Sequence, residues 1–110
     1  MKKLRDVLSD KSKWTTRAMA RDADDDCVGV NSEEACKFCL VGALDKLDLT
    51  AKEYNLKREK IGDYIRNFPD ADILYTSPVF GNGPKFYSLS KFNDSNSWET
   101  IDTMLNKLDI

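Results

Sequence analysis

The stretch NSEEACKFCLVGALDKL, residues 31–47, carries the strongest helix signal in the chain. Asn31 is a favourable N-cap residue, and Glu34, three positions later, can reach back to it as in a capping box. Apolar residues then recur at helical spacing, and Phe38 and Val41 make the middle of the stretch apolar nearly all round. We therefore predict one helix over residues 31–47, buried at the centre of the fold.

Two further helix starts follow on the C-terminal side. Thr50 can cap a helix with Glu53 closing its capping box, and the apolar positions of this helix continue to Pro69. Asn96 or Ser97 can cap a last helix whose apolar residues fall on one stripe. Helices are thus expected on both sides of the longest β-prone segment.

That segment, DILYTSPVFGNGPKFYSLSKF at residues 72–92, has two β-prone runs around Gly-Asn-Gly. Such a pattern is typical of a hairpin, and Pro78 and Pro84 would confine its strands to an edge. We predict an α+β fold that is mainly helical. Four to five helices would surround the buried helix at about 31–47, with a small β-hairpin near 72–92.

Composition indicates one compact domain over residues 1–110, with 41% hydrophobic and 33% charged residues. The net charge is -2, so we expect no nucleic-acid partner. The most basic run, LKREK at residues 56–60, lies among acidic residues, and we interpret it as a solvated helix face. No segment is apolar enough for a signal peptide core or a membrane span. With three cysteines, an odd number, these features favour the cytoplasm.

The chain contains no histidine, which excludes serine or cysteine nucleophiles activated by histidine. Its glycine-rich run, GNGPK at residues 81–85, lacks the spacing and the Gly-Lys-Ser/Thr ending of a phosphate-binding loop. We predict no cofactor, and we favour a binding role over an enzyme while leaving the latter open.

An acidic run offers an alternative metal site. Asp22, Asp24, Asp26 and Glu33 fall at positions 1, 3, 5 and 12 of a calcium-loop pattern. However, Cys27 occupies position 6, where the sharp turn requires glycine. A solvated loop without metal is the favoured interpretation, and the calcium cage is the alternative.

The cysteines suggest no zinc site, because three thiols without histidine lack a fourth ligand. Cys36 and Cys39 would lie inside the apolar face of the predicted helix, beyond its first turn. Thiols in such places usually act as small hydrophobic side chains, so we expect both to be core residues. Gly42, inside the same helix, predicts the close approach of another helix over Ala35, Cys39 and Gly42.

Trp14, ARDADDD (20–26), ACKFCLVGAL (35–44) and FNDSNSWETIDTMLNKL (92–108) together resemble an uncharacterised family of small bacterial and phage proteins, a domain of unknown function. Its pattern is a Trp, an Ala-Arg-Asp turn, a Cys-Leu-x-Gly-Ala helix, an Asn-Asp turn and a closing helix. Phe38 and Phe92 stand where that pattern has tryptophans, and the resemblance does not extend to residues 52–87. The resemblance implies a compact helical fold with no catalytic residue. The matching residues are Trp14, Cys39, Gly42, Ala43, Asn93 and Asp94.

These observations favour a non-enzymatic protein-interaction or regulatory module, encoded by a phage or mobile element and acting on a host protein. Its binding residues are expected among exposed aromatics and the Asn-Asp turn: Trp14, Phe80, Phe86, Tyr87, Asn93 and Asp94. The alternative is a small-ligand-binding protein or enzyme with a pocket around Cys39, Asn93 and Asp94. The sequence identifies neither the partner nor the oligomeric state, and it leaves open whether the aromatics of the hairpin tip are exposed or buried beneath the hairpin.

Overall fold

The computed structural model describes residues 2–75 and 87–110. Its helices are α1 (Leu4–Val7), α2 (Leu40–Lys46), α3 (Ala51–Arg66), α4 (Ala71–Leu74), α5 (Leu89–Ser95) and α6 (Trp98–Leu108). A 3-10 turn, η1, covers Lys11–Lys13, and two short strands, β1 (Ala20–Arg21) and β2 (Lys37–Phe38), pair antiparallel. The predicted class, α+β and mainly helical, is confirmed.

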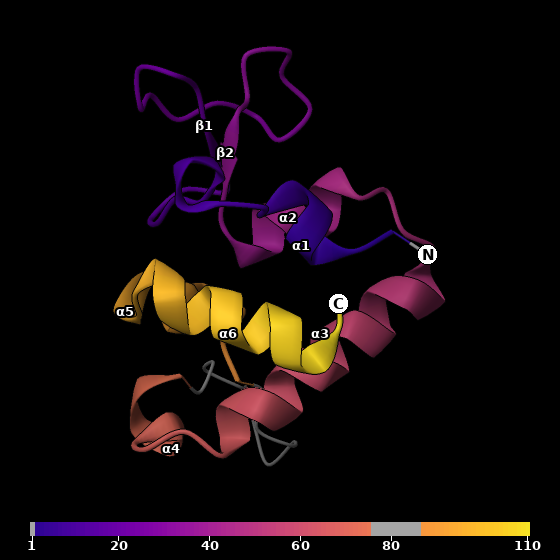
Figure 1. The fold of residues 1–110 in the computed structure, drawn as a ribbon, viewed down its shortest axis with the longest axis vertical. Helices are drawn as coiled ribbons and strands as arrows, with labels where there is room; N and C mark the ends of the chain where they lie inside the picture. Colours follow the sequence, from indigo (N-terminus) through magenta and orange to yellow (C-terminus); the bar gives the residue numbers. More distant parts are fainter. Residues whose placement is uncertain (1, 76–86) are drawn as a thin grey trace, which may run out of the picture.

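The helices form one end of the molecule and the two strands the other (Figure 1). Helix α6 lies across the middle, with α1 and α2 on one side and α3 crossing on the other. The two chain ends meet, because the Leu4 N–H donates to the carbonyl oxygen of Ile110 and Lys3 Nζ lies 2.9 Å from Asp109 Oδ1. The short α1 is thereby held against α6.

The core fills the space where these helices face one another. Its fully buried side chains include Leu4, Leu8, Leu40, Leu44, Ile61, Ile65, Phe92, Ile101, Met104, Leu105 and Ile110. Phe92 of α5 contacts the rings of Phe68 and Tyr75 edge-on, at centroid distances of 5.0 and 5.2 Å. These aromatic contacts attach α5 to both ends of the α4 region, because Phe68 precedes α4 and Tyr75 follows it.

Both predicted C-terminal helix starts are confirmed. The Thr50 hydroxyl accepts the Glu53 N–H, and the Glu53 carboxylate accepts the Thr50 N–H, each at 3.2 Å. Ser97, rather than Asn96, caps α6 by accepting the Thr100 N–H at 3.4 Å. In both places the cap needs only residues three positions apart, which the sequence shows directly.

The predicted start of the central helix at Asn31 is wrong. Helix α2 begins at Leu40, with Cys39 as its N-cap, and the Cys39 Sγ accepts the Gly42 N–H at 3.3 Å. Residues 31–36 form a loop and Lys37–Phe38 is strand β2. Pairing with β1 satisfies backbone groups of β2 and buries Phe38, so tertiary contact overrides the local helix preference.

Gly42 does mark a close approach, though the approaching segment is a loop and not a helix. A Cβ atom at this position would lie 1.9 Å from the carbonyl oxygen of Met19. The same carbonyl accepts the Cys39 N–H at 3.2 Å, so the start of α2 lies directly against the backbone before β1. Only glycine fits this contact.

The predicted hairpin near 72–92 is wrong at both of its described ends. Residues 71–74 form α4, and α5 begins at Leu89 with Ser88 as its cap. Residues 76–86 lie outside the described part of the chain. The strands occur instead at 20–21 and 37–38, where Arg21 faces Lys37 across the ladder.

None of the helices within residues 2–75 and 87–110 has the length and apolarity needed to cross a bilayer.

Candidate functional site

Asn93, from the predicted Asn-Asp site, is a fully buried hub between α5, α2 and the loop after η1. Its Oδ1 accepts the Trp14 Nε1–H at 2.7 Å and the Leu40 N–H at 3.2 Å. Its Nδ2 donates to the Thr15 carbonyl oxygen at 3.0 Å and to Asp94 Oδ1 at 3.1 Å. These four bonds use the full capacity of the amide, so Asn93 has none left for a ligand.

Asp94 and Cys39 lie beside this hub. Asp94 Oδ1 also accepts the N–H of Arg17, a residue in the left-handed conformation with φ 61°. The Cys39 thiol is buried, and burial first, with the nearby Asp94 charge as a smaller cause, raises its pKa. The structure therefore brings Cys39, Asn93 and Asp94 together, in an arrangement that fixes the loop against α2 and α5.

Trp14 is a half-buried part of the same hub. Besides its bond to Asn93, its ring lies 6.1 Å from that of Trp98, centroid to centroid. Tyr87 is also half-buried and packs against the core. The other two expected binding residues, Phe80 and Phe86, lie outside the described residues.

The acidic run forms a hydrogen-bonded turn. Asp22 Oδ1 accepts the N–H groups of Asp24 at 2.9 Å and Asp26 at 3.0 Å. Asp25 pairs with Lys37, and hydrogen bonding to that ammonium group lowers the pKa of the Asp25 carboxyl. The structure does not gather the alternative cage of Asp22, Asp24, Asp26 and Glu33. In the described ranges no three His, Cys, Asp or Glu side chains are grouped so as to hold a metal ion.

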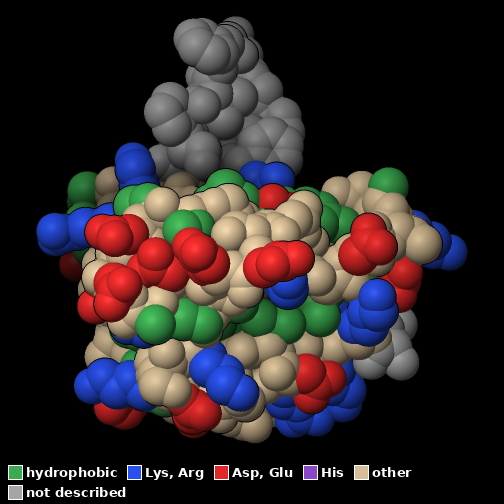
Figure 2. Space-filling view, turned by 90° about the horizontal axis from the view of Figure 1, so that it is seen from above, with side chains coloured by type: hydrophobic (Ala, Val, Ile, Leu, Met, Phe, Trp, Pro, Cys, Tyr) green, Lys and Arg blue, Asp and Glu red, His purple; other side chains and the backbone are tan. Residues whose placement is uncertain are grey.

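Acidic side chains nevertheless dominate part of this end of the molecule (Figure 2). They gather in a row, with a strip of apolar side chains beside them. The loops here contribute the exposed Asp24, Asp25, Asp26, Glu33 and Glu34. Cys27 and Cys36 are exposed in the same loops, so the prediction that Cys36 is a core residue is wrong, because β2 and not a helix follows it.

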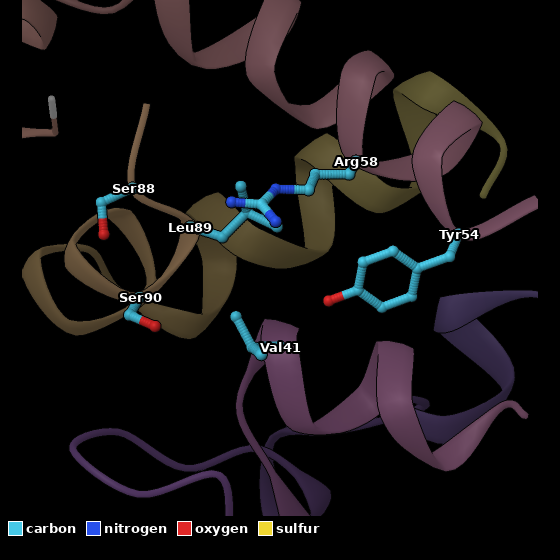
Figure 3. A pocket seen from close by; sticks show the side chains of 6 residues that line it. All are labelled: Val41, Tyr54, Arg58, Ser88, Leu89 and Ser90. Atoms are coloured by element: carbon cyan, nitrogen blue, oxygen red, sulfur yellow. The ribbon is translucent and has the colours of Figure 1, made fainter. Parts of the chain in front are cut away.

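A cavity of about 240 Å³ lies between α2, α3 and the start of α5. Its lining residues are Val41, Tyr54, Arg58, Ser88, Leu89 and Ser90. Figure 3 shows Tyr54 and Arg58 reaching in from α3, with the Tyr54 hydroxyl directed toward the space above Val41. We call this the Arg58 cavity.

Buried and exposed groups alternate around the Arg58 cavity. Leu89 is buried and Val41 is half-buried, and together they form an apolar wall. Arg58 and Ser90 are exposed. Ser88 caps α5 by accepting the Lys91 N–H at 3.2 Å, which leaves its hydroxyl hydrogen available for donation. The cavity thus combines an apolar wall with a guanidinium group and hydroxyls.

This site was not predicted from the sequence. Residues 56–60 were expected to form a solvated helix face, but Lys57 is only 4% exposed and Arg58 lines the cavity. Burial first, and the charge of Lys60 second, lowers the pKa of the Lys57 ammonium group. The available signal was the helical spacing of Tyr54, Lys57 and Ile61, which places them near one face of α3.

Comparison with known proteins supplies a family. A search of curated proteins and a search of solved structures found no match. A family model, described as a family of unknown function (DUF6197), matches residues 1–107. This match covers nearly the whole chain, including the hub and the Arg58 cavity. The chain belongs to this family of unknown function, DUF6197.

Proposed function

We propose that the protein is a non-enzymatic interaction module that binds a protein partner through the face containing the Arg58 cavity. The observation that carries this proposal is the combination of Arg58 and Tyr54 around a small apolar-walled cavity. Arginine and tyrosine are enriched among the residues that contribute most to protein–protein binding. These residues contribute most when the apolar pocket beside them is shielded from water in the complex.

The size of the cavity supports a protein partner over a small ligand. At about 240 Å³ it is smaller than the roughly 300–1,000 Å³ of typical ligand pockets. It can accept one side chain of a partner, while the surrounding faces of α3 and α5 provide further contact. The alternative pocket at Cys39, Asn93 and Asp94 has less support, because Asn93 makes all four of its hydrogen bonds to groups within the chain.

As in the sequence-based hypothesis, the proposed biological role is regulation of a host protein in the cytoplasm by a phage- or mobile-element-encoded module. A capture experiment from the cytoplasm of the native host tests the interaction. Wild-type protein, Arg58→Ala and Arg66→Ala serve as three baits, with captured proteins quantified by mass spectrometry. Arg66 is the matched control, because it lies exposed on the same helix and pairs with Asp63 at 3.2 Å.

The proposal expects a protein captured by wild type and by Arg66→Ala, and depleted by Arg58→Ala. Circular dichroism of the three baits checks that they are equally folded. Equal capture by all three baits would contradict the proposed surface, and no captured protein above a bead control would contradict the interaction role.

A further inference from the structure

The polar side chains that line the Arg58 cavity can all donate hydrogen bonds, and no carboxylate is among the described lining residues. Arg58 contributes a guanidinium group, and Tyr54, Ser88 and Ser90 contribute hydroxyls. A site with this composition complements a group that only accepts hydrogen bonds and carries negative charge.

Arg58 is also available for such a group. Arg5 pairs with Asp109, Arg21 donates to the carbonyl oxygens of Asp25 and Thr16, and Arg66 pairs with Asp63. Among the described residues, no acceptor lies within hydrogen-bonding or ion-pair distance of the Arg58 guanidinium group. No carboxylate in residues 2–75 or 87–110 therefore neutralises its charge at short range, in a protein of net charge -2.

The apolar wall restricts what can carry the negative charge. Leu89 is buried, and Val41 and Tyr54 pack against the core beneath the cavity. A fully hydrated ion would gain nothing from these side chains, whereas an apolar group joined to the anion would remove them from water. The cavity thus fits an anion with a short apolar part.

We propose that the Arg58 cavity binds a carboxylate attached to an apolar group, presented by a segment of the partner polypeptide. This inference rests on the proposed function and specifies the chemistry of the partner. One planar guanidinium fork matches one carboxylate in a bidentate pair. A phosphate group would draw on several cations, but Arg58 is the one cation among the described residues that line this cavity.

The test titrates three small probes into ¹⁵N-labelled protein and follows backbone amide shifts. Hexanoate carries both features of the proposed group, hexylammonium reverses the charge, and acetate lacks the apolar chain. Hexanoate is expected to saturate with a dissociation constant of about 1–10 mM, a range suited to so few atoms. Its shifts should centre on Val41, Leu89 and Ser90, and the other two probes should bind at least about fivefold more weakly.

Two variants then test whether the Arg58 guanidinium group binds the carboxylate of hexanoate. Arg58→Gln should weaken hexanoate binding by about tenfold or more, because a charge-assisted pair is lost. Arg66→Gln, the matched control on α3, should leave it within about twofold of wild type. Each variant's spectrum without probe shows whether it retains the fold.

Several results would overturn the inference: no saturable hexanoate shifts at the cavity, equal binding of hexylammonium, or tighter binding of hexyl phosphate when it is titrated as a fourth probe. Failure here is distinguishable from failure of the proposed function. A protein partner lost specifically by Arg58→Ala, with no hexanoate binding, would retain the interaction module and overturn the carboxylate chemistry.

Discussion

The contact between Gly42 and the Met19 backbone gives the sharpest prediction on stability, because the chain contains its own control. Gly42 and Gly62 both lie within helices, α2 and α3. A Cβ at Gly42 would lie 1.9 Å from the Met19 carbonyl oxygen, whereas nothing lies within 4 Å of one at Gly62. The same substitution, glycine to alanine, should therefore have opposite effects at the two positions.

The magnitudes follow from three contributions. Alanine stabilises a helix interior by about 1 kcal/mol relative to glycine at either position. At Gly42 the added methyl group must displace backbone atoms, which costs about 1–3 kcal/mol. Moving Met19 also weakens its bond from the Cys39 N–H, worth about 1 kcal/mol. Gly42→Ala should thus destabilise the fold by about 1–3 kcal/mol, and Gly62→Ala should stabilise it by about 0.5–1 kcal/mol.

Guanidinium unfolding followed by circular dichroism measures both free energies of unfolding. The decisive result is the sign of the change in the free energy of unfolding, which should be negative for Gly42→Ala and positive for Gly62→Ala. If Gly42→Ala is as stable as wild type, or if both variants shift in the same direction, the packing of α2 on the loop before β1 is wrong.

Three other predictions follow from buried polar groups and thiols. Asn93→Ala should lower the free energy of unfolding by about 2–4 kcal/mol, since it removes four hydrogen bonds and leaves buried donors unpaired; a loss below about 1 kcal/mol in denaturant unfolding would contradict the hub. Burial lowers the pKa of the Lys57 ammonium group in the folded state, whereas the unfolded chain keeps the ordinary pKa of 10.5. Between these two pKa values the unfolded state binds more protons, so the free energy of unfolding of the wild type rises with pH. Lys57→Met should therefore melt at a higher temperature than wild type at pH 7, with an advantage that shrinks toward pH 10.5; a constant or negative difference would refute this. A thiol reagent should label Cys27 and Cys36 quickly and Cys39 slowly, because burial shields the Cys39 thiol and raises its pKa. Three equally fast thiols would show that Cys39 is accessible.

Local sequence was sufficient where a structural feature depends on neighbours three or four positions apart. The Thr50–Glu53 capping box was predicted with both of its residues, and Ser97 was one of the two caps predicted for the last helix. The class of fold followed from helical spacing. The start of the central helix was not predictable in this way. Asn31 has the local features of a cap, but strand pairing at Lys37–Phe38 determines the fold of that segment.

The candidate site depended still more on distant residues. The Arg58 cavity joins α3 to residues 88–90, and the hub joins Asn93 to Trp14 and Leu40. Nothing in the spacing of these residues indicates that they meet. The Asn-Asp turn was identified as important, but as a ligand site, because its hydrogen-bond partners lie 53 and 79 positions away in sequence.

Site-specific photo-crosslinking in the native host tests the central proposal, a partner bound at the Arg58 cavity, most directly. A photoreactive phenylalanine analogue would replace Ser90, an exposed residue of the cavity lining, and, as a control, Thr103, an exposed residue of α6. The account predicts a discrete protein adduct from position 90 that Arg58→Ala reduces by about tenfold, and little or none from position 103. Equal adducts from both positions, or an adduct from position 90 that Arg58→Ala leaves unchanged, would contradict it.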